Sequence, residues 1–514
     1  MSKNIWKVAG GVTLITFVSR LSGYIRDKVM AYILGASFLS DSFFVAFRIP
    51  NMFRGLLAEG ALHAAFIPIF SEVKREKEKE ILRFASQVFY LLTFISAGIV
   101  VLGIIFSPFI INLMAKEFNL IEGKFSLTVL LNRIMFPYLF FISLAGLMQG
   151  ILNVLSKFYL PASTPIFLNI SIIILGISLS KFGLNPVYSF SFGVLFGGFL
   201  QFYLQYREVK KIGINFYFPK NLISPEVKEL FYKILPGIFA LGINEINQII
   251  GTRFAAFSGD KSVSYLYYSF RLIHLVYGGV IVSLFTLLLP SLSNDVKDSE
   301  KFSSKLNEGI HLTSFLTIPS ILGLFFLSKP IILVLFQGGR FKPEDTTEVA
   351  FCLMAYSFSL LPYAYSKILT SAYFAKKNTK TPAFSSLVAL ITFVIFCFIL
   401  TSKYKHIGIA LSNSISSFFQ LFYLLVFSKK YIPEYNIKDL FYDFLKILTF
   451  NFPIFFILFY LSKTVFINLN QSFYLIGIKL FFTIIFIILI YFFLGIFFKI
   501  KGSFLLKNLL KGER

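Results

Sequence analysis

Cysteine, acidic residues and charge in general are scarce in this chain. Its two cysteines, Cys352 and Cys397, lie in apolar runs and offer neither a disulfide framework nor a metal-binding spacing. The four histidines are scattered and form no H-E-x-x-H motif, so we predict no metal site. Only 14% of the residues are charged and 56% are hydrophobic. Over 514 residues, this composition excludes a large soluble protein and predicts an all-α polytopic membrane protein.

Motifs for energy conversion and for catalysis are also missing from the sequence. There is no G-x-x-x-x-G-K-[ST] phosphate loop, so we predict that the chain itself does not hydrolyse ATP. The longest loop, 207–228, is too short to form a folded domain. We expect no cofactor, and no cleavable signal peptide, because the first apolar segment is long and contains arginines.

The net charge of +24 is large for a protein with so few charged residues. Nucleic-acid binding would explain such an excess, but the basic residues lie between apolar runs, which is typical of the positive-inside pattern. Roughly 27 Lys and Arg fall in the two termini and the even-numbered loops, against roughly 10 in the odd-numbered loops. We therefore exclude nucleic acid as a partner and predict that both termini are cytoplasmic.

Apolar windows of about 20 residues predict about 14 transmembrane helices. Their expected ranges are 7–35, 41–70, 83–114, 126–155, 160–180, 186–206, 228–257, 263–292, 306–336, 346–374, 382–401, 406–427, 440–462 and 471–498.

Three segments recur in the same order, at offsets of 222, 225 and 217 residues. Six helices separate the matched points, so we predict two parallel-repeat six-helix lobes around a central cavity. The N-lobe would cover 1–215 and the C-lobe 216–435. Residues 436–514 have no repeat counterpart and would add two helices and a basic C-terminus. The matched pairs centre on Pro68 and Pro290, Pro137 and Pro362, and Pro165 and Pro382.

The stretch 19–71 concentrates charge inside two apolar segments. Each charge at mid-depth in a bilayer costs about 2.5–3.5 kcal/mol on insertion scales. One interpretation is that long side chains snorkel to the headgroups. The alternative, which we favour, is a cationic, water-filled cavity that receives an anionic substrate. The charged residues of the stretch are Arg20, Arg26, Asp27, Lys28, Asp41, Arg48, Arg54 and Glu59.

Several arginines in one cavity suit a phosphate or pyrophosphate, because the guanidinium group binds these anions in a bidentate way. Arg253 and Arg271 lie in apolar helices of the second half and would add to the cavity. The acids Asp27, Asp41 and Glu59 would act as counter-ions or gating residues. Asn244 and Glu245 would form either a cation site or a polar contact between helices, and Arg48 is expected to tolerate substitution better than the other arginines.

The segments SRLSGYIRD, SDSFFVAFRIPNMFRGLLAEGALHAAFIPIFSE, YYSFRL and LFQGGRF resemble the lipid II flippase family, MurJ/MviN, in the same order. The resemblance covers essentially the whole chain. It implies a 14-helix exporter fold whose last two helices form a groove for a polyprenyl tail. By motif, it implies functional roles for Arg20, Arg26, Arg54, Arg271, Asp41 and Glu59. The chain departs from the family pattern at Phe270, where an acid is common.

We predict a flippase that moves the peptidoglycan precursor lipid II across the bacterial inner membrane by alternating access. The alternatives are an exporter of another polyprenyl-linked oligosaccharide or of drugs and, less favoured, a membrane glycosyltransferase. Drug exporters favour cations, and the outward loops lack a paired acidic motif for glycosyl transfer. Lipid II, membrane lipids and other cell-wall synthesis proteins are the expected partners. The energy source stays open between a Na⁺ gradient, a H⁺ gradient and the membrane potential.

The orientation can be tested by cysteine labelling from outside the cell. Cysteines placed at positions 77 and 300 should resist an impermeant reagent, because the basic residues around them are predicted to be cytoplasmic. A cysteine at Gly259 should react. The opposite labelling pattern would reverse the predicted orientation and, with it, the direction of transport.

Overall fold

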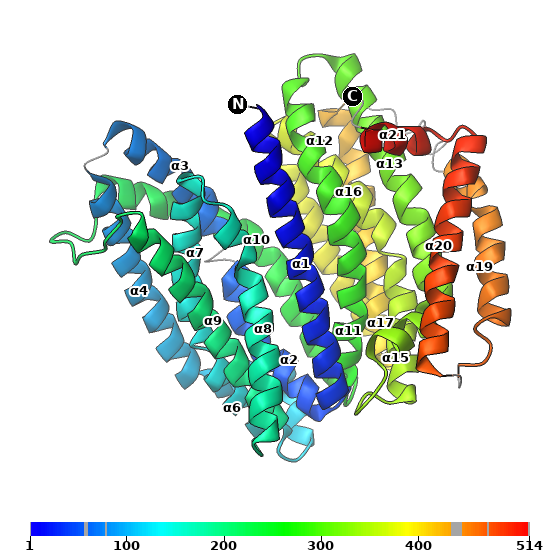
Figure 1. The fold of residues 1–514 in the computed structure, drawn as a ribbon, viewed down its shortest axis with the longest axis horizontal. Helices are drawn as coiled ribbons and strands as arrows, with labels where there is room; N and C mark the ends of the chain where they lie inside the picture. Colours follow the sequence, from blue (N-terminus) through cyan, green and yellow to red (C-terminus); the bar gives the residue numbers. More distant parts are fainter. Residues whose placement is uncertain (1, 56–59, 78–79, 433–444, 470–471, 512–514) are drawn as a thin grey trace. The chain divides into compact units, whose positions relative to one another are not determined.

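The computed structural model describes residues 2–55, 60–77, 80–432, 445–469 and 472–511. Within these ranges the regular elements are helices, apart from one isolated β-bridge between Gly338 and Phe341, which confirms the all-α prediction (Figure 1). The chain divides into two compact units, unit 1 (Met1–Ser264) and unit 2 (Tyr265–Arg514). In order, unit 1 holds α1 (Ser2–Leu34), α2 (Phe38–Phe53), α3 (Ala61–Glu76), α4 (Ile81–Ile105), α5 (Ser107–Ala115), η3 (Lys116–Leu120), α6 (Lys124–Met135), α7 (Tyr138–Val154), α8 (Tyr159–Lys181), α9 (Pro186–Lys211) and α10 (Pro225–Phe257).

Helix α11 (Ser262–Val276) begins at the end of unit 1 and continues in unit 2. The short helix η4 that follows it has π-type geometry. The later elements are η4 (Tyr277–Ile281), α12 (Val282–Asn294), α13 (Ser299–Phe326), α14 (Ser328–Phe336), α15 (Pro343–Ser357), α16 (Leu360–Ala375), α17 (Lys380–Tyr431), α19 (Phe452–Thr464), α20 (Phe473–Phe497) and α21 (Lys501–Lys511).

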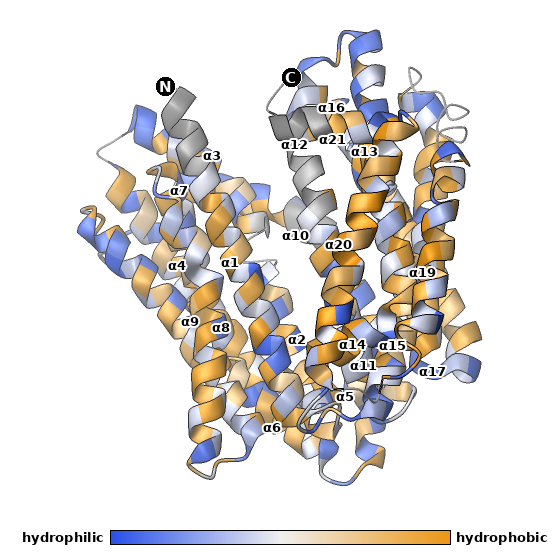
Figure 2. Cartoon of the chain, turned by 45° about the vertical axis from the view of Figure 1, so that its right-hand side comes forward, coloured by the Kyte–Doolittle hydropathy of each residue, from blue (hydrophilic) through white to orange (hydrophobic). Residues whose placement is uncertain are grey.

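Seven helical stretches of the described residues are long and apolar enough to cross a membrane, with α6 and α7 counted together as one stretch. The number is eight if the bent pair α15 and α16 forms one further span. Helices α8 and α20 are hydrophobic along most of their length (Figure 2). A multi-pass membrane protein is therefore confirmed, whereas the count of about 14 spans and the central cavity stay predictions.

Several apolar segments predicted as single helices are broken in the structure. The range 126–155 holds α6 and α7, and 346–374 holds α15 and α16. In the range 41–70, residues 56–59 between α2 and α3 lie outside the described residues. Proline accounts for the break in 126–155, since Pro137 lies between α6 and α7 and its ring cannot continue the hydrogen-bond ladder. Hydropathy detects the apolar run but not the break within it. The other divided ranges are 83–114 (α4, α5), 263–292 (α11, η4, α12) and 306–336 (α13, α14).

Helix α17 differs from the prediction in the opposite way. It is one element of 52 residues where the sequence predicts two separate helices. Its backbone leaves the helical region at Lys405, with φ of 48° and ψ of −131°. A kink at that residue separates the two predicted spans. Helix α21, which follows α20, was not predicted from the sequence.

The positions of the helix breaks support the internal repeat. Helix α4 ends at Ile105 and α5 continues with a proline, Pro108, in its first turn. Helix α13 ends at Phe326 and α14 continues in the same way with Pro330, 222 positions after Pro108. The two units therefore share a local break as well as similar sequence.

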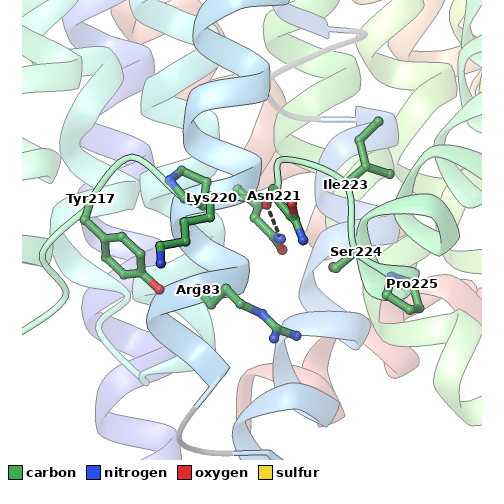
Figure 3. Close-up of a pocket in the computed structure, with 9 residues that line it drawn as sticks. Arg83, Tyr217, Lys220, Asn221, Ile223, Ser224 and Pro225 are labelled. Carbon is green, nitrogen blue, oxygen red and sulfur yellow. Dashed lines mark hydrogen bonds between the residues drawn. The ribbon is translucent and has the colours of Figure 1, made fainter.

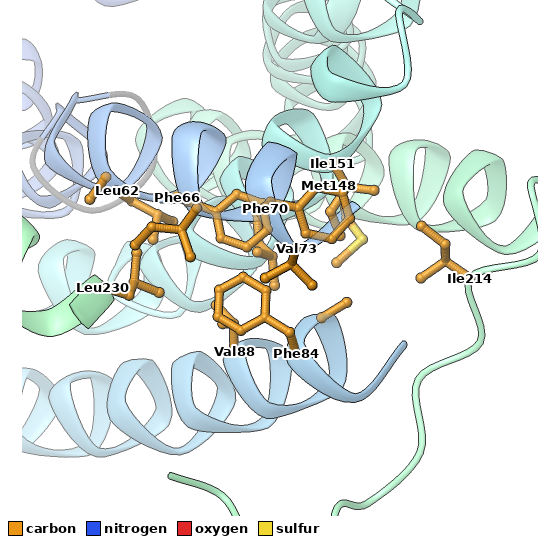
Figure 4. Packing of buried hydrophobic residues seen from close by; sticks show 14 of the residues in the cluster. Leu62, Phe66, Phe70, Val73, Phe84, Val88, Met148, Ile151, Ile214 and Leu230 are labelled. Atoms are coloured by element: carbon orange, nitrogen blue, oxygen red, sulfur yellow. The ribbon is translucent and has the colours of Figure 1, made fainter. Parts of the chain in front are cut away.

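Stacked aromatic rings form the hydrophobic core of unit 1 at one end of the helices (Figure 4). The ring centroid of Phe66 on α3 lies 5.1 Å from that of Phe70 and 5.8 Å from that of Phe84 on α4. Met148 of α7 and Leu230 of α10 complete the buried cluster. Such rings bury large apolar areas, so this cluster fixes α3, α4, α7 and α10 against one another.

Helices α8 and α9 approach each other closely through glycine (Figure 1). A Cβ atom added at Gly193 of α9 would lie 2.7 Å from the Cα atom of Ile172, and one at Gly197 would lie 3.1 Å from the Cα atom of Leu168. Small residues four positions apart are the usual means of close helix packing in membranes. This contact holds α8, which carries one residue of the candidate site described below.

We expect Gly193→Ala to destabilise the protein by about 1–3 kcal/mol, because the added methyl group meets backbone atoms that cannot rotate away. The measurement is thermal unfolding of the purified protein in detergent. Gly98→Ala on α4 is the matched control, since a Cβ atom there meets no atom within 4 Å. Equal melting temperatures for the Gly193 variant and the wild type would contradict this packing argument.

Candidate substrate-binding site

The Arg26 guanidinium group is held from two sides inside unit 1. Its Nε and Nη2 atoms donate to Oδ1 of Asp27 at 3.0 and 2.6 Å. Its Nη1 atom donates to Oδ1 of Asn169 on α8 at 3.1 Å. Asp27 is fully buried and the Arg26 side chain is 12% exposed. A charged pair this deep in a membrane protein must satisfy its hydrogen bonds internally, which fixes the direction of the guanidinium group.

Asn169 links this pair to the preceding part of α1. Its Nδ2 atom donates to Oγ of Ser22 at 2.9 Å, while its Oδ1 atom accepts from Arg26. The side-chain amide of Asn169 therefore contacts α1 at two residues and orients Arg26. The sequence offered a signal for Asn169, since it is a lone amide in an apolar helix, but not for its contact with Arg26. Arg20 lies on α1 and is partly exposed.

A second group of charged residues joins α2 and α10 in unit 1. Arg48 donates from Nη1 to the backbone oxygen and to Oε1 of Gln248, each at 3.4 Å. Gln248 donates in turn to Oε2 of Glu245 at 3.5 Å. The charges of Arg48 and Arg54 both act on the Glu245 carboxylate. Arg54 also donates from Nε to Oδ1 of Asn51 at 3.0 Å.

This arrangement bears on two of the predictions made from the sequence. Gln248 links Arg48 to Glu245, so a polar contact between helices and a cation site both stay predictions for this acid. Arg48 takes part in the same group, so it is not an independent control for the other arginines. The side chain of Asn244 and the whole of Glu59 lie outside the described residues.

Asp41 is the centre of a buried hydrogen-bond network at the start of α2. Its Oδ2 atom accepts from Nζ of Lys124 and from the backbone nitrogen of Lys261, both at 2.8 Å. Its Oδ1 atom accepts from the backbone nitrogen and the hydroxyl group of Ser264, at 2.8 and 2.6 Å. Lys124, also fully buried, reaches Oδ1 of Asp260 at 2.7 Å.

The Asp41 network joins three of the predicted outward loops. Asp41 directly follows the first loop, Lys124 belongs to the third loop, and Asp260 belongs to the seventh. The sequence predicted arginine as the partner of Asp41, whereas the structure gives lysine and backbone donors. Lys124 was missed because it lies outside the apolar windows, and its burial depends on segments distant in the sequence.

The two arginines predicted in the second half lie in different units. Arg253 of α10 belongs to unit 1 and donates from Nη1 to Oε2 of Glu117 at 2.9 Å. Arg271 lies on α11 in unit 2 and its side chain is exposed. Its neighbour Phe270 packs against His274 and Tyr356, with ring centroids 4.3 and 5.2 Å apart. The acid that the family often has before Arg271 is therefore replaced by an aromatic contact.

Unit 2 contains an apolar groove of about 370 Å³ between α13, α19 and α20. The phenol group of Tyr491 donates to the backbone oxygen of Phe315 at 2.7 Å and fixes α20 against α13. The lining includes Phe315, Pro319, Leu324, Leu458, Ile487 and Tyr491. A groove of this composition accommodates a hydrocarbon chain. Among the described residues, no three His, Cys, Asp or Glu side chains come together as a metal site.

The fold is similar to that of solved membrane transporters. An inward-facing multidrug transporter of the MATE family, in the MOP superfamily, superposes with a TM-score of 0.70. The match covers 83% of this chain and 98% of that transporter, at 13% sequence identity. A solved lipid II flippase MurJ in an inward closed conformation gives a TM-score of 0.81 and 31% identity, over 95% of this chain and 98% of its own.

Sequence comparison then defines the family. The family profile described as "Lipid II flippase MurJ" matches residues 30–482. The probable lipid II flippase MurJ of Buchnera aphidicola subsp. Baizongia pistaciae is 38% identical over 84% of this chain and 86% of its own length. The lipid II flippase MurJ of Burkholderia cenocepacia is 34% identical over 80% of this chain and 82% of its own. The chain belongs to the lipid II flippase MurJ family.

A double-mutant cycle tests whether Asp41 and Lys124 are energetically coupled. We expect Lys124→Met alone to destabilise the protein by about 3–5 kcal/mol, because it leaves a buried carboxylate without its cation. The double variant Asp41→Asn/Lys124→Met should lose less stability than the sum of the two single variants. The measurement is unfolding in detergent.

The exposed pair Lys233 and Glu229 is the control for this cycle, since the lysine side chain is 50% exposed. Lys233→Met should change stability by at most about 1 kcal/mol. Strict additivity of the Asp41 and Lys124 variants would show that the pair is not coupled.

Proposed function

We propose that this protein is a lipid II flippase of the bacterial cytoplasmic membrane. Its family, and relatives that carry this name over more than four fifths of their length, support the proposal. The resemblance noted from the sequence motifs agrees with these matches. The protein is a transporter rather than an enzyme, and the lack of a phosphate loop in its sequence is consistent with that.

The observation that carries the mechanism is the orientation of Arg26 by Asp27 and Asn169. Arginine binds pyrophosphate through a planar fork, and the fork has to be held in place before the substrate arrives. While the site is empty, Asp27 balances the charge of the guanidinium group. A pyrophosphate group would compete with Asp27 for the same donors. The buried Asp27 carboxylate would then need a proton or another donor, because a buried charge without a partner is costly.

The remaining proposed contacts follow the chemistry of the substrate. Arg20, Arg54 and Arg271 would add positive charge for the pyrophosphate. The apolar groove of unit 2 would hold the polyprenyl tail, because its lining is hydrocarbon and aromatic. The head group would then cross by alternating access while the tail remains in an apolar environment.

The Asp41 network is our proposed gating element. It joins Asp41, at the start of α2, to the side chain of Lys124 on α6 and to the backbone nitrogens of Lys261 and Ser264, at the start of α11. Breaking it would expose a carboxylate and an ammonium group to water, which stabilises both. In one state of the transport cycle, the network would be intact and inaccessible to water. In the other state, its hydrogen bonds would be broken and its charged groups would contact water.

Orientation and energy coupling complete the proposal. Both termini would be cytoplasmic by the positive-inside pattern, and transport would run from the inner to the outer leaflet. A Na⁺ gradient, a H⁺ gradient or the membrane potential would supply the energy. Other cell-wall synthesis proteins would be partners at the outer leaflet.

Arginine substitutions test the pyrophosphate site. We expect Arg→Ala at positions 20, 26, 54 and 271 to abolish or severely impair complementation in cells depleted of their own flippase. Each loss should cost about 1.5–3 kcal/mol, or one to two powers of ten in binding. Arg→Lys should be impaired at two or more of these positions, because lysine lacks the planar fork. Immunoblots of membranes would establish that each variant accumulates.

Arg133→Ala is the matched control. Arg133 lies on α6, is exposed, and donates from Nε to the backbone oxygen of Ile104 at 3.2 Å. This variant should complement fully. Normal flipping by the Arg20, Arg54 and Arg271 alanine variants at wild-type abundance would overturn the anionic cavity.

A further inference from the structure

Unit 1 contains a polar pocket of about 460 Å³ that the proposed transport mechanism does not use (Figure 3). It lies between the first turn of α4 and the linker that connects α9 to α10. Two cations, Arg83 and Lys220, line it, together with the polar side chains of Tyr217, Asn221 and Ser224. No carboxylate is among its lining residues. The pocket therefore has the electrostatic character of an anion site.

The linker that forms one wall of the pocket is fixed to α4. Gln87 donates from Nε2 to the backbone oxygen of Asn221 at 2.7 Å, and the backbone nitrogen of Tyr217 donates to Oγ of Ser86 at 3.2 Å. The ring of Phe216 stacks on that of Phe89 with centroids 4.5 Å apart. These contacts pre-form the wall, so a ligand would not have to order the linker on binding.

Two carboxylates lie next to the pocket in the sequence. Glu226 accepts from Nζ of Lys77, which is outside the pocket lining, at 2.7 Å. Glu80 accepts from Nη2 of Arg83 at 2.7 Å, so one bond of this pocket cation is to a carboxylate and a bound anion would share the guanidinium group with Glu80. The hydrogen bond from Lys77 lowers the pKa of Glu226 to about 2, so this ion pair persists at neutral pH. Ser224 caps α10 through its hydroxyl oxygen, which places the positive end of that helix at the pocket.

The rim of the pocket is apolar and exposed. Tyr217, Phe218 and Ile223 are 47%, 62% and 59% exposed, although all three belong to a linker outside the predicted spans. Aromatic and aliphatic side chains beside lysine and arginine are typical of the zone where a protein meets lipid headgroups. A soluble anion would need the cations of the pocket but would gain nothing from this rim.

We propose that the pocket binds the phosphate group of an anionic phospholipid, with Arg83 and Lys220 as its cationic ligands. The exposed Tyr217, Phe218 and Ile223 contact the upper acyl region of the same lipid. The assignment to the inner leaflet rests on the orientation proposed above, whereas the binding itself does not. A bound lipid here would fasten the linker between α9 and α10 to the membrane surface.

Native mass spectrometry of the full-length protein, titrated with phosphatidylglycerol or phosphatidylcholine, tests the proposal. The wild type should retain one tightly bound phosphatidylglycerol in preference to phosphatidylcholine. Arg83→Gln/Lys220→Gln should weaken that binding about tenfold or more, since each cation near a membrane surface contributes on the order of 1 kcal/mol. Arg83→Lys/Lys220→Arg keeps both charges and should retain the lipid, which separates loss of binding from misfolding.

Lys210→Gln/Lys211→Gln is the matched control, because it removes two exposed charges near the end of α9 without touching the pocket. It should change binding less than about twofold. If both Gln double variants lost lipid binding to the same extent, the effect would come from general surface charge, and the proposed site would be overturned. Displacement of the lipid by millimolar inorganic phosphate would also overturn it, by assigning the pocket to a soluble anion.

Discussion

A charged side chain buried in a membrane protein needs an opposite charge and hydrogen-bond partners within the protein. Within the described part of unit 1, this constraint is met by the buried pairs Arg26 with Asp27 and Asp41 with Lys124. Asn169 joins α8 to the first pair, and Lys124 joins α6 to α2. The partly exposed pair Arg253 and Glu117 joins α10 to η3. The positions of α1, α2, α6 and α10 near these residues therefore depend on charge pairing as well as on apolar packing.

The same constraint explains how a transport site can be both charged and stable. Asp27 and Asn169 satisfy the Arg26 guanidinium group in the absence of substrate. In the proposed mechanism, a pyrophosphate group would take over donors that Asp27 uses, and Asp27 would then need a new partner. Asp41 is satisfied by donors from two other segments, so any movement that separates them has to admit water. Substrate binding and gating would thus use the same physical device, which is the exchange of one partner of a buried charge.

The sequence predicted the parts of the structure that depend on local composition. The helical membrane class and the pairing of Asp27 with an arginine follow from hydropathy and charge, whereas the two repeat lobes stay a prediction. The breaks between α4 and α5 or α13 and α14 were missed because the apolar run continues through them. Lys124 and Asn169 were missed for a different reason. Lys124 contacts Asp41, 83 positions away in the sequence, and Asn169 contacts Arg26, 143 positions away. No local sequence pattern reveals contacts between residues so far apart.

The proposed function is tested most directly by depleting this protein in its own cells and measuring lipid II at the outer leaflet. The measurement is the fraction of lipid II that an impermeant probe or enzyme can reach. Our account predicts that lipid II accumulates while its accessible fraction falls, and that re-expression of the wild-type chain restores accessibility. An unchanged accessible fraction after complete depletion, with no other flippase present, would contradict it.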